Sequence, residues 1–105
     1  MNKIEETTLP RPVQYAPSRE AILGTHSFPG EFMIKAFGPN SQEFRQEIAA
    51  CAHRVVTSER VQISERSTKS GHKICITLTL EVHQVEEIEI LYAQIHQVTH
   101  LQMIL

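Results

Sequence analysis

The stretch that decides the fold runs from Gly71 to Val82 and reads GHKICITLTLEV. Within it every second residue is aliphatic, and these residues are Ile74, Ile76, Leu78, Leu80 and Val82. The residues between them are polar or small. Strict alternation over ten residues, with many β-branched side chains, predicts a strand that buries one face and exposes the other. The rest of the chain supplies what covers the apolar face or borders the strand.

Two other segments have the spacing of amphipathic helices, and both can cover that face. The first begins after a cap at Asn40 or Ser41 and ends near Val56–Thr57, and Glu43 is placed to complete a capping box with Asn40. The second covers Gln84–Gln97 and opens with glutamates, which suit the positive end of a helix dipole. The apolar stripes are Phe44, Ile48, Cys51 and Val55 in the first helix, and Val85, Ile88, Leu91, Tyr92 and Ile95 in the second.

Three further segments alternate as strands, namely Glu31–Phe37, Arg60–Thr68 and Thr99–Leu105. The order of elements is therefore β-α-β-β-α-β. Two right-handed crossovers and one hairpin place the first and third strands in the centre of the sheet. The sequence predicts a ferredoxin-like α+β fold, with a four-stranded antiparallel sheet of order 4-1-3-2 and both helices on one face.

The other face of the predicted sheet carries no helix and is a candidate interaction face. Its residues mix apolar and polar side chains, as docking surfaces often do, and they are Met33, Lys35, Phe37, Cys75, Thr77, Thr79, Gln102 and Ile104. Gln62, Ser64 and His100 are expected on the same side. Two interpretations stay open: a solvated sheet, or a surface that docks a protein, with a second copy in a homodimer as the simplest partner.

Length and charge indicate one small domain, since the chain has 105 residues and a net charge of −2. Residues 1–27, with three prolines, are predicted to be a flexible arm, and residues 28–105 to be the folded domain. We expect a cytoplasmic protein, because there is neither an apolar run long enough to span a membrane nor the apolar core of a signal peptide.

No set of residues in the sequence points to catalysis, a metal or a cofactor. None of the six histidines has ligand spacing with a cysteine or carboxylate. Cys51 falls on the apolar stripe of the first helix, and Cys75 on the open face has no histidine placed to activate it. An acylphosphatase would need an arginine in the loop after the first strand, whereas the next arginine, Arg45, is already inside the helix. We therefore predict a protein that binds and does not catalyse.

RNA-recognition domains share the predicted topology, and they carry stacking aromatic residues on the two central strands. Here the strand Gly71–Val82 has no aromatic residue, and the first strand offers only Phe37 on the open face. The net charge provides no general attraction to nucleic acid, and the basic patch at the hairpin is small. RNA binding is therefore disfavoured. The patch consists of Arg66, Lys69, His72 and Lys73.

Three pieces of the sequence resemble the YbeD-like family of small, functionally uncharacterised bacterial proteins. They are FPGEFMIKAFG at 28–38, STKSGHKICITLTLEV at 67–82 and VEEIEILYAQIHQVTHLQMIL at 85–105. The resemblance covers about Phe28 to Leu105 and implies a ferredoxin-like fold similar to the ACT domains. ACT domains are regulatory modules that bind small ligands, often amino acids.

The similarity to ACT domains implies a ligand site in the loop after the first strand. Gly38, Asn40 and Ser41 occupy that loop, next to a helix start whose free amides favour an anion such as a carboxylate. The plainer interpretation of these residues is a strand stop followed by a helix cap. The function expected is a non-enzymatic domain that senses a small ligand, and the alternative is an adaptor that docks a protein through the open face or an edge strand.

Overall fold

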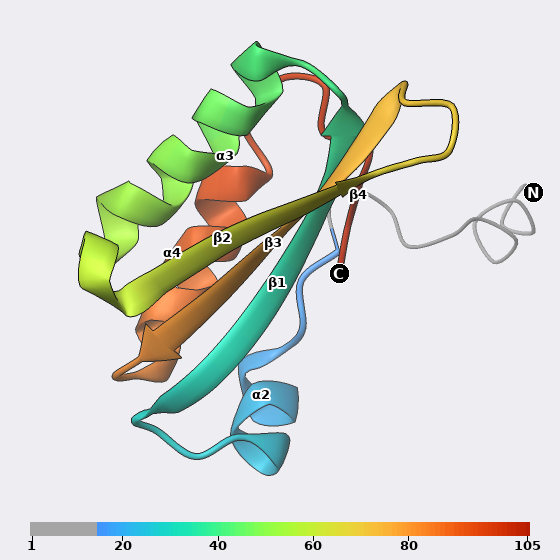
Figure 1. The fold of residues 1–105 in the computed structure, drawn as a ribbon. Coiled ribbons are helices and arrows are strands. Elements are labelled where there is room, and N and C mark those ends of the chain that lie inside the picture. The colour runs from blue at the N-terminus through green and yellow to red at the C-terminus, as the bar shows by residue number, and fades with distance from the viewer. Residues whose placement is uncertain (1–14) are drawn as a thin grey trace, which may run out of the picture.

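The computed structural model describes residues 15–105, and its elements follow the predicted order after one additional helix (Figure 1). The elements are α2 (Arg19–Thr25), β1 (Gly30–Pro39), α3 (Gln42–Val55), the 3-10 helix η1 (Ser58–Arg60), β2 (Val61–Ser67), β3 (Lys73–Val82), α4 (Val85–Ile95) and β4 (Met103–Ile104). The strands form one antiparallel sheet of order β2-β3-β1-β4. The predicted ferredoxin-like α+β arrangement is confirmed.

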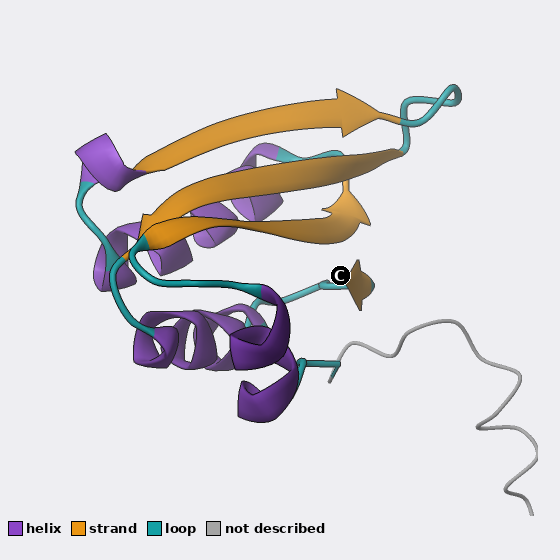
Figure 2. Ribbon diagram, turned by 90° about the horizontal axis from the view of Figure 1, so that it is seen from below, coloured by secondary structure: helices purple, strands orange, loops and turns teal. Residues whose placement is uncertain are grey.

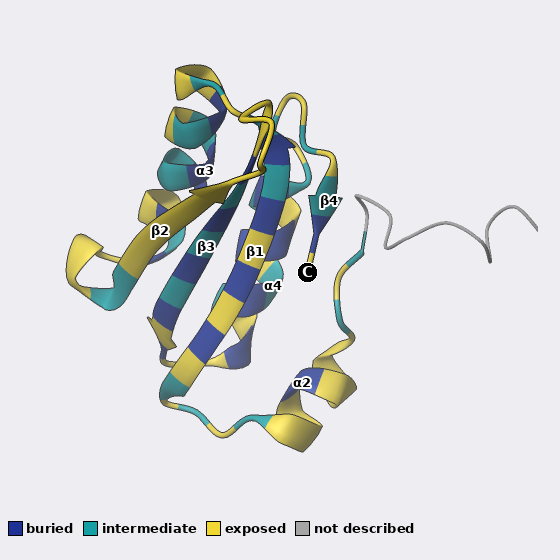
Figure 3. Ribbon diagram, turned by 45° about the vertical axis from the view of Figure 1, so that its right-hand side comes forward, coloured by how far each residue is buried: buried dark blue, intermediate teal, exposed yellow. Residues whose placement is uncertain are grey.

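The core lies between the helices and one face of the sheet. The alternation of buried and exposed residues that places this face is visible along β1 in Figure 3. All five aliphatic residues predicted to lie on one face of β3 are buried, at no more than 2% exposure. Period two in the strands and period 3.6 in the helices direct these side chains into one layer. The residues that join those of β3 include Phe32, Ile34 and Ala36 from β1, Phe44 and Ile48 from α3, and Ile88 and Leu91 from α4.

At the start of each long helix, a side-chain oxygen accepts a hydrogen bond from a backbone amide. Ser41, one of the two predicted caps, precedes α3, and its Oγ accepts a hydrogen bond from the Phe44 amide at 3.1 Å. Gln84 precedes α4 without a side-chain cap. There the carboxylate of Glu87 accepts a hydrogen bond from the backbone amide of His83 at 2.8 Å, which pairs a donor just before the helix.

The last strand departs from the prediction in length and register. After α4 the chain makes further turns, closed by hydrogen bonds between residues three apart as far as Leu101, and His100 has a φ of 69°. Only Met103–Ile104 remain as β4, and there Ile104 pairs with Ala36 and Met103 with Phe37. The prediction that Ile104 lies on the open face is wrong, because Ile104 is 0% exposed and Met103 stands on that face. For Met103 and Ile104 the predicted register is off by one residue, which reverses the faces of these two side chains.

The described part of the predicted N-terminal arm packs against the domain. Ile22 of α2 is 2% exposed and belongs to the common core. Arg19 of α2 donates two hydrogen bonds to the carboxylate of Glu89 in α4, at 2.6 and 3.0 Å. Figure 2 shows α2 beside α4 in the helix layer, so the packed part of the chain begins before residue 28. Residues 1–14, the rest of the predicted arm, lie outside the described residues.

The segment that leads into α2 is also held. The ring of Tyr15 meets the ring of Tyr92 edge to face, with centroids 6.4 Å apart. Nε2 of His96 donates a hydrogen bond to the carbonyl oxygen of Tyr15, at 2.9 Å. These contacts fix the path of the chain next to the end of β4, where the hydroxyl of Tyr92 donates to the carbonyl oxygen of Leu105.

Candidate functional site

The predicted ligand loop after β1 is held by contacts inside the domain. Gly38 is buried, and a Cβ at this position would come within 2.5 Å of the Phe44 ring. Glycine is therefore needed for α3 to pack on β1. The Ser41 side chain serves as the cap of α3.

Asn40, the third predicted ligand residue, joins this loop to the hairpin between β2 and β3. Its Nδ2 donates to the carbonyl oxygen of Gly71 at 2.8 Å, and its Oδ1 accepts from the guanidinium of Arg45 at 2.6 Å. The Asn40 backbone amide donates to the carbonyl oxygen of His72 at 2.9 Å. Arg45 in turn donates to the carboxylate of Glu65 on β2. The side chains of both Asn40 and Ser41 thus have partners within the domain.

The open face of the sheet holds most of the predicted interaction residues. Six of them are on β1 and β3, at the positions that alternate with the core: Met33, Lys35, Phe37, Cys75, Thr77 and Thr79. Met33 is 50% exposed, whereas Phe37 and the three β3 residues are half-buried. Gln102 is exposed just before β4, and its amide donates to the carbonyl oxygen of Phe37 at 2.8 Å. With Ile104 in the core, Met103 completes the face.

A hollow lies at the hairpin end of the open face. One row of neighbours crosses all four strands there, in the order Arg66, Cys75, Phe37 and Met103. The hollow has a volume of about 260 Å³ and is lined by Phe37, Arg66, Ser67, Thr68, Lys73, Ile74 and Cys75. Phe37 and Cys75 supply apolar walls, and Arg66 and Lys73 add two cations. We call Arg66 and Lys73 the basic end of the face.

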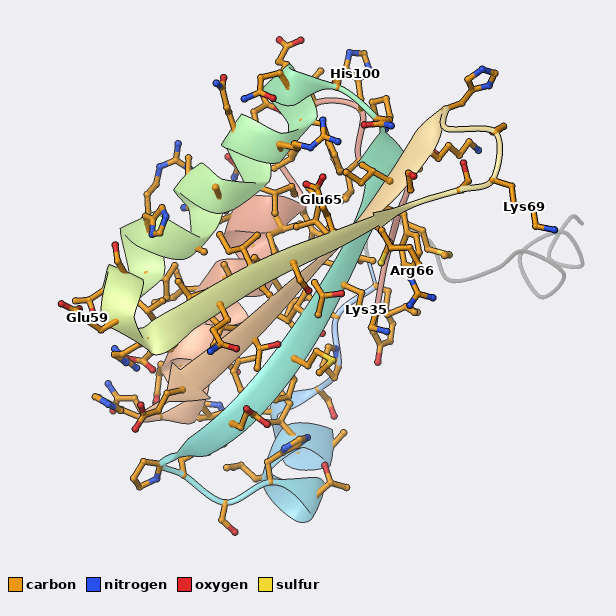
Figure 4. All side chains as sticks on the ribbon, in the orientation of Figure 1. Lys35, Glu59, Glu65, Arg66, Lys69 and His100 are labelled. Atoms are coloured by element: carbon orange, nitrogen blue, oxygen red, sulfur yellow. The ribbon has the colours of Figure 1, made fainter. Side chains whose placement is uncertain are left out.

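The opposite end of the open face is acidic. Glu31 of β1 and Glu81 of β3 are direct cross-strand neighbours, and both are exposed. They line a second hollow of about 520 Å³, together with Glu59 and with Arg60, whose guanidinium donates to the carbonyl oxygen of Glu81 and to the carboxylate of Glu87. We call Glu31 and Glu81 the acidic end. In Figure 4, Arg66 and Lys69 lie towards the hairpin between β2 and β3, and Glu59 lies near the start of β2, at the opposite end of that strand.

The charges of both ends are unpaired within the described chain. The ion pairs in residues 15–105 involve Arg19, Arg45 and Arg60, and none includes a side chain of either end. The sequence shows Arg66 and Lys73 only as part of a small hairpin patch. It does not align Glu31 with Glu81, because that alignment requires the register between β1 and β3.

A further cleft of about 330 Å³ lies between α3 and α4. Among its lining residues, Arg54 donates to the side-chain oxygen of Gln94 at 3.0 Å, and Cys51 is buried. Burial raises the pKa of the Cys51 thiol, although the nearby Arg54 opposes the shift. This environment disfavours the reactive thiolate form of Cys51.

Within residues 15–105, no group of three or more metal-ligating side chains gathers in one place. The helices of this part of the chain are all too short or too polar to cross a membrane.

Comparison with known proteins places the chain in a family. No curated protein matches it. The family described as "Protein of unknown function (DUF493)" matches residues 24–105, which is most of the chain and includes every strand of the sheet. The chain therefore belongs to the DUF493 family.

Proposed function

We propose that this domain binds another protein on its open face and has no catalytic activity of its own. The observation that carries the proposal is the hollow at the basic end, where the apolar walls of Phe37 and Cys75 stand next to Arg66 and Lys73. Apolar pockets that lose water on binding supply most of the affinity of an interface, and flanking charges select the partner. We also propose that the chain is a YbeD-like protein and that it works in the cytoplasm of a bacterium.

The chemistry of the hollow defines the partner that fits it. An apolar side chain would fill the space beside Phe37, and carboxylates on either side of it would meet the two cations. Such a partner is a protein surface or segment with one exposed apolar residue flanked by glutamates or aspartates. A uniformly basic or purely polar surface would leave Arg66 and Lys73 without a counter-charge.

Sensing of a small ligand in the manner of ACT domains, with Gly38, Asn40 and Ser41 as the site, stays a prediction. A ligand there would compete with contacts that the protein already makes. Gly38 is covered by Phe44, Asn40 binds Gly71 and Arg45, and Ser41 caps α3. Within residues 15–105 the side chains of the open face make no such contacts, so protein docking is the better supported function.

Binding of a synthetic peptide tests the proposal. The peptide carries one leucine between two pairs of glutamates and is titrated into the ¹⁵N-labelled full chain while amide shifts are followed. We expect saturable shifts centred on Phe37, Cys75 and Arg66. A peptide with lysines in place of the glutamates should cause no shifts, and one with alanine in place of leucine should bind at least tenfold more weakly. Shifts that are absent from the face at millimolar peptide, or equal for all three peptides, would contradict the proposal.

A matched pair of variants assigns the binding to the basic end. Arg66→Gln removes one positive charge from the hollow, and Gln46→Glu makes the same change in net charge on the exposed surface of α3. We expect about tenfold weaker peptide binding for Arg66→Gln, since one charge-assisted hydrogen bond contributes about 1.5–3 kcal/mol. Gln46→Glu should bind as the unmodified chain does.

A further inference from the structure

We infer that the partner of the open face is a second copy of this chain, placed face to face with the first and running in the opposite direction. The inference rests on the proposed function, because it names the protein that the open face docks. In this pair the basic end of each copy lies on the acidic end of the other.

The acidic end has the chemistry that the hollow selects. Met33 is an apolar residue, 50% exposed, two positions from Glu31 on the same side of β1. Glu81 stands directly across from Glu31, and Thr79 stands across from Met33. The chain therefore presents one exposed apolar side chain with two carboxylates on one side of it and Lys35 on the other, and the carboxylate side matches the partner defined by the basic end.

The electrostatics of the isolated chain favour the same pairing. Like charges directly opposite each other destabilise a pair of strands, and Glu31 and Glu81 are such a pair near one end of the two central strands. Within residues 15–105 neither carboxylate forms an ion pair, and neither do Arg66 and Lys73. With a second copy placed face to face by a two-fold axis, Lys73 of each copy meets Glu81 of the other, so both charges gain a partner at the same time.

The register of the strands allows both contacts to form together. Ser64, Thr77 and Lys35 make one row across the sheet. Lys73 and Glu81 each lie four positions from this row along β3, Met33 and Phe37 each lie two positions from it along β1, and Arg66 lies two positions from it along β2. A two-fold axis that runs along this row, between the two copies, places Met33 over the second copy's Phe37 and Glu81 over its Lys73. Within one chain, Met33 and Phe37 are about 14 Å apart, at 3.4 Å per residue. The two-fold symmetry therefore gives two equivalent contacts between Met33 and Phe37, one on each side of the axis. Sheets that pack in this way lie about 10 Å apart, which side chains fill.

Lys35 is the residue that this arrangement does not suit. It lies on the axial row, so two lysines approach each other across the interface, and their side chains must bend towards solvent. The arrangement therefore predicts that Lys35→Gln tightens the pair, whereas a loss at Arg66 or Lys73 weakens it.

Charge reversal at the two ends tests the inference. One variant carries Arg66→Glu and Lys73→Glu, the other carries Glu31→Lys and Glu81→Lys, and the mass of the full chain is measured by sedimentation over a range of concentrations in low salt. We expect a dimer for the unmodified chain and at least tenfold weaker association for each variant alone. An equimolar mixture of the two variants should form a heterodimer, since one carries two acidic ends and the other two basic ends. Glu43→Lys, on the exposed surface of α3, should leave the dimer intact.

Three outcomes would overturn the inference: a monomer at every concentration, a dimer that neither reversal weakens, or variants that fail to associate when mixed. Circular dichroism of each variant shows whether it is folded, and if one reversal unfolds, the other reversal and Lys35→Gln still decide the matter. A monomer whose hollow binds the acidic leucine peptide would reject the second copy and keep the proposed function. A dimer insensitive to both reversals, with no peptide binding, would reject both.

Discussion

Gly38 of β1 lies against the ring of Phe44 in α3, so closely that a Cβ at position 38 would stand 2.5 Å from two ring carbons. Phe44 is 1% exposed and sits in the first turn of the helix. The glycine thus allows α3 to pack on the sheet at the point where the chain leaves β1. The ligand role predicted for Gly38 has to be weighed against this structural one.

Gly38→Ala is expected to lower the free energy of unfolding by about 1–3 kcal/mol, the usual cost of an added methyl group in a packed core. Urea denaturation followed by circular dichroism measures the change. The matched control is Gly24→Ala in α2, where a Cβ would meet no atom within 4 Å. Alanine there should leave stability unchanged or raise it by up to about 1 kcal/mol, because alanine favours a helix. Equal effects at the two glycines would show that Phe44 does not restrict position 38.

Asn40→Ala is expected to loosen the junction between the loop after β1 and the hairpin. The change removes the hydrogen bonds to Gly71 and from Arg45. Each such bond contributes about 1 kcal/mol, so the Asn40 and Gly71 amides should exchange several-fold faster with deuterium. Asn40→Asp keeps the acceptor for Arg45 and loses only the donor to Gly71, and it should have an intermediate effect. Unchanged exchange in Asn40→Ala would favour a ligand role for this side chain over a structural one.

The parts of the fold that were predictable are those with long, regular periods. β3 alternates over ten residues, and the stripes of α3 and α4 keep helical spacing over several turns, so local pattern and tertiary burial agree. β4 was not predictable in this way. Its two residues follow a series of turns whose length depends on contacts with the end of α4, and a strand of two residues carries no period.

The charged ends of the open face could not be predicted from the sequence either. Each residue is visible in the sequence, but Glu31 and Glu81 lie 50 positions apart in the chain, and only the β1–β3 register brings them together. Prediction of strand order does not supply register to the residue, and an error of one residue reverses faces, as it did for Ile104. The sequence therefore predicted the open face but not its division into a basic end and an acidic end.

Ile22→Ala is expected to destabilise the whole domain, although the residue lies in the segment predicted to be an arm. Ile22 is 2% exposed within the common core, and truncation of such a residue costs about 2–5 kcal/mol. The neighbouring Leu23 is 51% exposed, so Leu23→Ala should change stability by less than about 0.5 kcal/mol. Thermal unfolding of the two variants makes the comparison, and an Ile22→Ala transition as high as that of Leu23→Ala would indicate that α2 contributes nothing to stability.

Glu87→Gln is expected to make stability less dependent on pH in the acidic range. Glu87 accepts a hydrogen bond from Arg60 at 2.6 Å, and both side chains are less than one fifth exposed. Partial burial tends to raise the pKa of Glu87, but the hydrogen bonds from Arg60 and from the His83 amide outweigh it and lower the pKa below 4.5. A carboxyl whose pKa is lowered by folding stabilises the protein above its unfolded pKa, and this stability is lost as the pH falls through the folded pKa.

The free energy of unfolding should therefore fall by about 1–2 kcal/mol in Glu87→Gln at pH 7, in the range of a hydrogen bond to a charged group. The difference from the unmodified chain should shrink below pH 4.5 and vanish once Glu87 is protonated in the folded state. Urea denaturation at a series of pH values from 7 to 3 measures it. Glu86→Gln is the control, since Glu86 is 51% exposed and its pair with Arg19 is solvated, so its effect should stay below about 0.5 kcal/mol. A Glu87→Gln deficit that persists unchanged at pH 3 would show that shape, and not charge, makes the contribution of Glu87.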